Sequence, residues 1–429
     1  MGQETTLIIG AGVDKTNGIG LPLANELIPG IAIFAKKEGK KYEEAITSFL
    51  PNLRFSFNKI IQDSIELFAS YDESKIGKII KDLENESENG KDKLIFDVLK
   101  KLFSKVKNIK EEGKLDDETI KDIEKLLDEE SKKELSDEYI IELSKASFTD
   151  SFRLILKAIL KRSIENPNNP ISKVLSQHFL DLESLLAKTF LGFYTESLAE
   201  IKKYLYISWM LWAYLKTREK EVLEKESIPF YPNIPEDFKV ISFNYTSFLS
   251  KRTNLKKENY LYFHGVLDKY LKFDTRTWIE LECEDIHEFL ENTVRQNTDL
   301  KNGKYLLPGI IPPLKLKPVL SSNFIEDWYK ANEWIQNSKR IIVIGYSFNY
   351  ADEHFNDIIR KKLNNSNQVL YIINPDAENL KERIKKIFSL SDNYFTGIEK
   401  KEHLVFSSEK IKIIGAKADE IALDSIDEF

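Results

Sequence analysis

The chain has 429 residues, a formal net charge of −7 at pH 7 and a pI near 5.6. Its overall charge therefore does not attract nucleic acid, and direct nucleic-acid binding by this chain alone is not expected. Hydrophobic residues make up 42% of the sequence, enough for large cores in two or three domains. The single cysteine, Cys283, excludes an internal disulfide and a four-cysteine zinc site, and it indicates a reducing compartment.

No secretory leader is apparent at the start of the sequence. The longest apolar segment, residues 204–215, is shorter than the roughly 20 residues that a membrane span needs. We therefore expect a cytoplasmic protein without membrane contact.

The first predicted element is a short apolar strand, Thr6–Ile9, which runs into a glycine-rich turn, GAGVDKTNGIGLP, at 10–22. This turn is not a dinucleotide fingerprint of the GxGxxG type, because Lys15 stands where the third glycine belongs. It is also not a Walker A loop, because the glycines required before Lys15 and Thr16 are missing. The turn is either a plain strand–helix connection or a loop whose N–H groups approach a phosphate.

Residues 36–235 show a different pattern, in which apolar residues recur at helical spacing, as at 117–130 and 151–164. Lysine and glutamate are mixed along this region, which favours solvated helical faces over a basic binding patch. An aromatic stripe within it is interpreted as helical core, with a partner surface as the alternative; its residues are Tyr204, Tyr206, Trp209, Trp212 and Tyr214.

After a proline-punctuated linker at 227–238, short strands alternate with helices. The predicted strands are 239–243, 259–265, 340–348 and 369–374, and the predicted helices are 324–338, 351–365 and 376–389. This alternation predicts an α/β fold with a doubly wound, Rossmann-like parallel sheet, interrupted by a large all-helical insertion. Residues 1–35 and 236–429 would form the two parts of one domain, and 36–235 the insertion.

Several predicted strands end on polar groups: Asn244, His264, Gly345 with Ser347, and Asn374 with Asp376. Turn chemistry, helix N-capping by Asp352 or Asp376, and a buried core histidine each explain one of them. Their convergence at one edge of one sheet instead favours a ligand site, because open α/β sheets bind ligands at the carboxyl ends of their strands. A metal role for Asp352, Glu353 and His354 is an alternative to capping, and His178 and His287 are interpreted as packing or surface residues.

The segments GAG…GLP, FNYT, FHG, GYS and IIN, in this order, resemble motifs of the sirtuin superfamily. The resemblance is greatest to the sirtuin-like NAD-hydrolysing proteins of bacterial anti-phage defence, and the FNYT and HG elements also resemble an abortive-infection family. It covers residues 5–25 and about 239–390, but not the helical region. The sequence departs from the sirtuin pattern in two places: Thr246 replaces an aspartate, and residues 23–25 replace Asp-Phe-Arg.

The resemblance implies that Asn244 and His264 are catalytic and flank the nicotinamide ribose. It also implies a set of NAD-binding residues: Gly10, Ala11, Gly12, Asp14, Gly20, Pro22, Gly345, Ser347 and Asn374. Nicotinamide leaves NAD as a neutral molecule, so the reaction needs no general acid and no metal, unlike ordinary glycoside hydrolysis by two carboxylates. A histidine that titrates near neutral pH and an amide that orients water are suited to it.

We therefore expect a metal-independent NAD glycohydrolase that acts in abortive infection against phage. The resemblance further implies a partner such as a hexameric motor ATPase or a phage-derived trigger, and we expect a homo-oligomer formed through the helical insertion. A sirtuin-type protein deacylase is an alternative, but it usually carries the four-cysteine zinc module that this chain lacks. A non-catalytic sensor of NAD or ADP-ribose is the other alternative, against which Asn244 and His264 together favour catalysis.

Overall fold

The structure is a computed structural model, which describes residues 5–57, 73–87, 174–175, 178, 182–312, 321–365 and 368–429. The helical patterns at 117–130 and 151–164 lie outside these residues. Two compact units are distinguished by their internal contacts: the first contains 1–24, 39–53 and 183–429, and the second contains 25–38 and 54–182. Each is described by itself.

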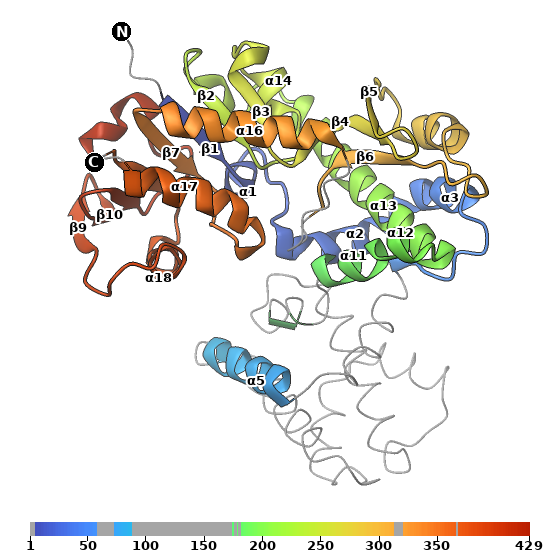
Figure 1. The fold of residues 1–429 in the computed structure, drawn as a ribbon, viewed down its shortest axis with the longest axis horizontal. Coiled ribbons are helices and arrows are strands. Elements are labelled where there is room, and N and C mark those ends of the chain that lie inside the picture. The colour runs from blue at the N-terminus through green and yellow to red at the C-terminus, as the bar shows by residue number, and fades with distance from the viewer. Residues whose placement is uncertain are drawn as a thin grey trace. The chain divides into compact units, whose positions relative to one another are not determined.

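The first unit is built on a mixed but mainly parallel sheet of eight strands in the order β3-β2-β1-β7-β8-β11-β10-β9 (Figure 1). The strands are β1 Thr5–Ile9, β2 Lys239–Ser242, β3 Tyr260–Tyr262, β7 Arg340–Ile344, β8 Leu370–Ile373, β9 Thr396–Lys400, β10 His403–Ser407 and β11 Ile411–Ile414. The predicted α/β class and the parallel pairing of the five predicted strands are confirmed.

Both faces of the sheet are buried along its parallel strands, because alternate apolar residues of these strands enter different cores, whereas the edge strand β9 is exposed. Ile8, Ile241 and Val343 belong to a core that also contains residues of three helices, namely α16 Ser322–Asn337, α17 Glu353–Asn365 and α18 Ala377–Ile387. Leu7 and Val240 belong to the opposite core, which includes the proline-rich linker and the C-terminal segment. Burial of each aliphatic side chain contributes roughly 1.5–3 kcal/mol.

A second, antiparallel sheet of three strands, which lies in the chain between β3 and β7 of the main sheet, was not predicted. It consists of β4 Gly265–Lys272, β5 Thr277–Glu280 and β6 Leu306–Ile310 in the order β5-β4-β6. The predicted strand 259–265 is wrong in its extent, because it divides between β3 and β4. Gly265 makes the break with a φ of +81°, and a Cβ there would lie 2.0 Å from the Gly309 carbonyl oxygen, so only glycine fits.

Helix α13, Leu198–Leu223, packs against this small sheet through the aromatic stripe. The indole Nε1 of Trp209 donates to the Leu306 carbonyl at 3.1 Å, and that of Trp212 donates to the Leu267 carbonyl at 2.9 Å. All five stripe residues are buried within the chain, as their interpretation as core requires. The stripe therefore offers no exposed aromatic surface at 204–214 through which the expected homo-oligomer could form.

Short helices complete the first unit. They are α1 Ala11–Asp14, η1 Ala24–Glu26 at the unit's boundary, α3 Lys40–Ser48, α11 Leu182–Phe190, α12 Gly192–Thr195, η3 Tyr231–Asn233, α14 Phe248–Arg252, η4 Lys257–Asn259, α15 Ile286–Glu288, η5 Phe289–Val294, η6 Tyr350–Asp352 and η7 Leu423–Glu428. Helices α3 and α13 belong to the same compact unit as the sheet, although both lie inside the predicted insertion 36–235.

The second unit contains helices α2 Leu27–Lys36 and α5 Glu73–Ser87. His178 Nε2 lies 2.9 Å from Asp82 Oδ2 of α5, in keeping with its interpretation as a packing residue. Within the described residues of both units, none of the helices combines the length and the hydropathy that a membrane span requires.

Candidate functional site

The site lies at the carboxyl edge of the main sheet, where five neighbouring parallel strands end in one row. Strand pairing aligns Ile9 with both Ser242 and Ile344, Ser242 with Tyr262, and Ile344 with Ile373. The residues that follow this row come from segments far apart in the sequence, and they include Gly10, Asn244, His264, Gly345 and Asn374. The polar residues predicted at strand ends are thus brought to a single edge.

The glycine loop after β1 packs directly against the turn after β7. Gly12 N–H donates to the Gly345 carbonyl at 2.9 Å, and Gly10 N–H donates to the Ile344 carbonyl at 3.0 Å. Gly345 has a φ of +64°, and a Cβ on it would lie 2.5 Å from the backbone nitrogen of Val13. Close packing of backbone on backbone therefore accounts for these glycines. A phosphate would have to bind other N–H groups, because eight in the loop 10–22 are already used inside the chain: those of Gly10, Gly12, Val13, Lys15, Thr16, Ile19, Gly20 and Leu21.

Asn244 follows β2, and its side chain points back to the glycine loop. It is 5% exposed, and its Nδ2 donates to the Gly10 carbonyl at 3.2 Å and, more weakly, to the Tyr231 hydroxyl at 3.4 Å. Its Oδ1 is buried without a hydrogen-bond partner among the described residues. A buried amide oxygen in this state is costly, so it fits an acceptor that a bound molecule or water would satisfy.

Asp14, at the end of α1, lies beneath Asn244 and is held by two hydroxyl groups. Tyr231 OH donates to its Oδ1 at 2.5 Å, and Thr246 Oγ1 donates to its Oδ2 at 2.8 Å. Burial raises the pKa of Asp14 from 3.8 to about 7, although hydrogen bonds from Tyr231, Thr246 and Asn244 oppose the shift. The negative charge of Glu219 raises it further. Thr246, which departs from the sirtuin motif, thus binds a carboxyl group supplied by the glycine loop.

The raised pKa of Asp14 predicts a pH-dependent stability that Asp14→Asn removes. Between about pH 4 and pH 7 the folded protein keeps a proton that the unfolded chain releases, so the free energy of unfolding falls as pH rises. This contribution is fully present below the unfolded pKa and is lost as pH passes the folded value. Its slope is at most about 1.4 kcal/mol per pH unit.

Urea unfolding of both proteins across this pH range measures the effect. Asp14→Asn should gain stability relative to the unsubstituted protein as pH rises, whereas Asp237→Asn, at an exposed position, should follow the unsubstituted protein. Parallel pH profiles for Asp14→Asn and the unsubstituted protein would contradict a raised pKa at Asp14.

His264 follows β3, the strand next to β2, and forms a buried pair with Asp352 of η6. Its Nε2 lies 3.0 Å from Asp352 Oδ1, and both side chains are 7% exposed. The Phe243 ring packs edge-on against the imidazole with 4.9 Å between ring centres. Tyr346 OH lies 3.4 Å from Asp352 Oδ2, so a hydroxyl on the turn after β7 also reaches this carboxylate. The imidazole and the carboxylate thus lie within ion-pair distance of each other in a buried environment.

The suggested N-cap by Asp376 on the following helix is not observed. Asp352 pairs with His264, and Asp376 makes no side-chain cap on α18. Asn374 accepts from the Asp376 N–H at 2.9 Å through its Oδ1, which is ordinary turn chemistry. His354 contacts the rings of Phe263 and Trp328, which also stack on each other.

The remaining predicted NAD-binding residues lie at or near the same edge. Ala11, Gly20 and Ser347 are exposed and Pro22 is partly buried. The Ser347 carbonyl accepts from Arg383 at 2.9 Å. These contacts leave the proposed roles of the side chains open to binding experiments.

Three residues of the site were not identified from the sequence: Tyr231, Asp352 in its pairing role, and Glu219. Tyr231 lies between prolines in a segment interpreted as a linker. Glu219 and Lys216 continue the helical spacing of the buried Trp209 and Trp212, so charged residues on an apolar stripe were a signal that could have revealed them.

Across the part of the chain that the structure describes, no group of three or more histidine, cysteine or acidic side chains is arranged to hold a metal ion. No family model matches the sequence, and no curated protein matches it.

Proposed function

We propose that this protein is an NAD glycohydrolase that cleaves NAD to nicotinamide and ADP-ribose on a doubly wound, Rossmann-like sheet of the sirtuin type. One observation carries the proposal: the buried Asn244 amide oxygen has no hydrogen-bond partner among the described residues, at the strand edge that also carries the His264–Asp352 pair. Buried polar groups with unused capacity beside a buried histidine are typical of sites that bind and transform a polar molecule.

The chemistry divides between the leaving group and water. The bond from ribose C1′ to the nicotinamide nitrogen breaks, its electron pair goes to the ring nitrogen, and nicotinamide leaves neutral. A water oxygen bonds to C1′, and its proton goes to His264. The Asp352 carboxylate, 3.0 Å from His264 Nε2, stabilises the protonated imidazole. Asn244 Oδ1 accepts from the attacking water or from a ribose hydroxyl and so fixes its position.

The role in anti-phage defence and the partner ATPase or phage-derived trigger remain proposals that rest on the sequence resemblance. An enzyme that destroys NAD must be controlled in the cell, so we propose that a partner or ligand shifts the population of competent sites. Oligomer formation stays part of this proposal, without a surface assigned to it.

The proposal is tested by incubating the purified protein with NAD and measuring nicotinamide and ADP-ribose over time. The two products should appear in equal amounts. NADH is the matched control, because its reduced ring is not a cation and would leave as an anion, so it should not be cleaved.

Each alternative function gives a different result in the same experiment. Binding of NAD by calorimetry without product would favour the sensor, and removal of acetyl groups from lysine peptides would favour the deacylase. If the protein neither binds nor cleaves NAD at millimolar concentration, the proposed function is overturned.

A further inference from the structure

We propose that Glu219 of helix α13 is a positioning residue that fixes the segment carrying Asn244 and Thr246. The inference deepens the proposed function and rests on it for its catalytic consequence, while its structural part can be tested without NAD. Glu219 lies outside all the sequence motifs and does not contact Asn244 in the described hydrogen bonds. It acts through Ser247, three residues beyond Asn244.

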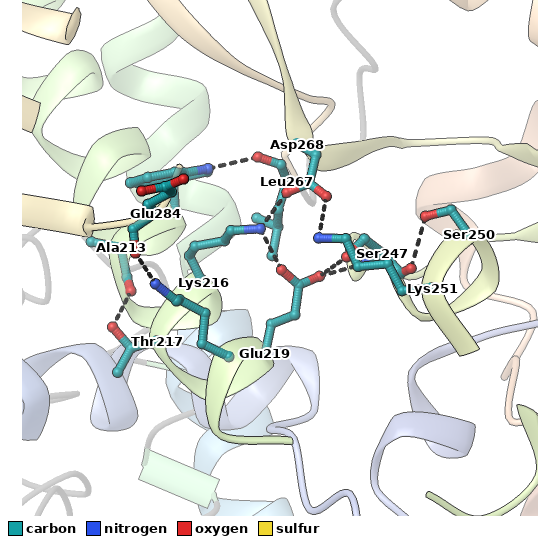
Figure 2. Close-up of polar contacts among 12 residues, drawn as sticks. Ala213, Lys216, Thr217, Glu219, Ser247, Ser250, Lys251, Leu267, Asp268 and Glu284 are labelled. Carbon is teal, nitrogen blue, oxygen red and sulfur yellow. Dashed lines mark hydrogen bonds and ion pairs between the residues drawn. The ribbon is translucent and has the colours of Figure 1, made fainter. Parts of the chain in front are cut away.

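The contact with Ser247 uses both donors of that residue (Figure 2). Glu219 Oε1 accepts from the Ser247 backbone N–H at 2.5 Å and from its hydroxyl at 2.8 Å. Glu219 is completely buried and Ser247 is 1% exposed. Ser247 directly precedes α14, and its carbonyl accepts from the backbone N–H groups of Ser250 and Lys251. One carboxylate therefore fixes the point at which the Asn244 segment enters a helix.

Glu219 is itself held by an ion-pair network that connects three elements (Figure 2). Lys216, one helical turn earlier, donates to Glu219 Oε2 at 2.6 Å and also pairs with Asp268 of β4. Asp268 pairs in turn with Lys251 of α14 at 2.7 Å. Although burial lowers the pKa of Lys216, Glu219 and Asp268 hold it above its ordinary value, so the lysine stays charged.

The network reaches the segments that follow β2 and β3, which carry Asn244 and His264. β4 begins at Gly265, immediately after His264, and the Leu267 N–H donates to the Tyr245 carbonyl at 2.9 Å. Helix α13 is thereby connected to the segment of Asn244 and to the strand that follows His264. Buried ion pairs are weak contributors to stability compared with apolar packing, and their best attested use is to specify one arrangement. That use fits α13, because Lys216 and Glu219 continue a buried stripe whose earlier members, Trp209 and Trp212, are apolar.

Glu219 also acts on the site through its charge. Burial is the main cause of the raised pKa of Asp14, and the negative charge of Glu219 adds to it. Removing this charge must therefore lower the pKa of Asp14. The titratable and charged groups around Asp14 and Glu219 are Tyr231, Lys216, Lys251, Tyr262, Asp268 and Tyr270.

Two substitutions separate position from charge. Glu219→Gln keeps an acceptor oxygen for Ser247 but removes the charge, whereas Glu219→Ala removes both. Glu221→Gln is the matched control, because Glu221 lies on the same helix, is half exposed and pairs only with Arg218 among the described contacts. Amide hydrogen exchange at 244–247 and NMR titration of the Asp14 carboxyl are measured on the full chain without substrate.

We expect Glu219→Ala to lose exchange protection at Ser247 and to lower kcat for NAD cleavage by about 100-fold with little change in KM, because small misplacements of reacting groups cost this much. Glu219→Gln should keep most of the protection, lower the Asp14 midpoint and reduce kcat less. Glu221→Gln should match the unsubstituted protein in every measurement.

The outcomes distinguish this inference from the proposed function. Unchanged protection at Ser247 and an unchanged Asp14 midpoint in folded Glu219 variants would overturn the positioning role, whether or not NAD is cleaved. Normal kcat in Glu219→Ala, beside an active unsubstituted enzyme, would also overturn it. If the unsubstituted protein does not cleave NAD, the proposed function fails, and the exchange and titration results still decide the structural part.

Discussion

Asn244→Ala is expected to lower the rate of nicotinamide release by at least ~100-fold, the size of effect seen when one positioned hydrogen-bonding group is removed from an active site. The buried amide oxygen that we assign to substrate or water is lost, and alanine offers no substitute. Some stability is also lost, because the Gly10 carbonyl no longer receives the Asn244 Nδ2 hydrogen bond. The cost should be about 0.5–1.5 kcal/mol, because the Gly10 carbonyl still accepts from the Val13 backbone N–H at 2.9 Å. A position at a strand end therefore does not make the substitution neutral.

Asn259→Ala is the matched control for this substitution. Asn259 donates to the Glu236 carbonyl at 3.0 Å and accepts from Lys239 at 2.7 Å, but it immediately precedes β3 and so lies at the opposite edge of the sheet. Asn259→Ala should lose similar stability and keep full activity. Comparable activity in folded Asn244→Ala and Asn259→Ala would remove Asn244 from the mechanism.

The sheet edge could be predicted from the sequence because its strands carry a local signal. Apolar runs such as Thr6–Ile9 and 239–243 are short, β-branched and followed by turn residues, which is the pattern of a buried parallel strand. Strand β9 lacks this signal. All five residues of β9 are exposed, so no apolar alternation marks it. The small sheet was missed for a related reason, since the break at Gly265 is imposed by backbone contact with Gly309 and not by a local pattern.

The partners of the site residues could not be predicted in the same way. Tyr231 and Asp14 are 217 positions apart, and His264 lies between β3 and β4 whereas Asp352 lies between β7 and α17. Only the tertiary packing decides which hydroxyl or imidazole reaches which carboxyl group. A local reading therefore gave Asp352 a capping role, because an aspartate before a helix is usually a cap.

The pair of His264 and Asp352 predicts opposite effects on stability for single and double substitution. His264→Ala should abolish nicotinamide release and also destabilise the fold by about 3–5 kcal/mol, since it leaves the buried Asp352 carboxylate without the imidazole. His264→Gln combined with Asp352→Asn removes both ionisable groups and keeps side chains of similar size. The double variant should recover most of the stability in urea unfolding while activity stays lost, with a large coupling free energy between the two positions.

His287 and Glu291 supply the matched control. They form a histidine–carboxylate pair at 3.8 Å, and their side chains are 35% and 48% exposed. Exposed pairs contribute about 0–1 kcal/mol, so His287→Ala should change neither stability nor nicotinamide release measurably. The double variant at 264 and 352 is decisive because it separates folding from chemistry. If it folds and still releases nicotinamide at the unsubstituted rate, His264 is a structural residue, and the proton of the attacking water must go elsewhere.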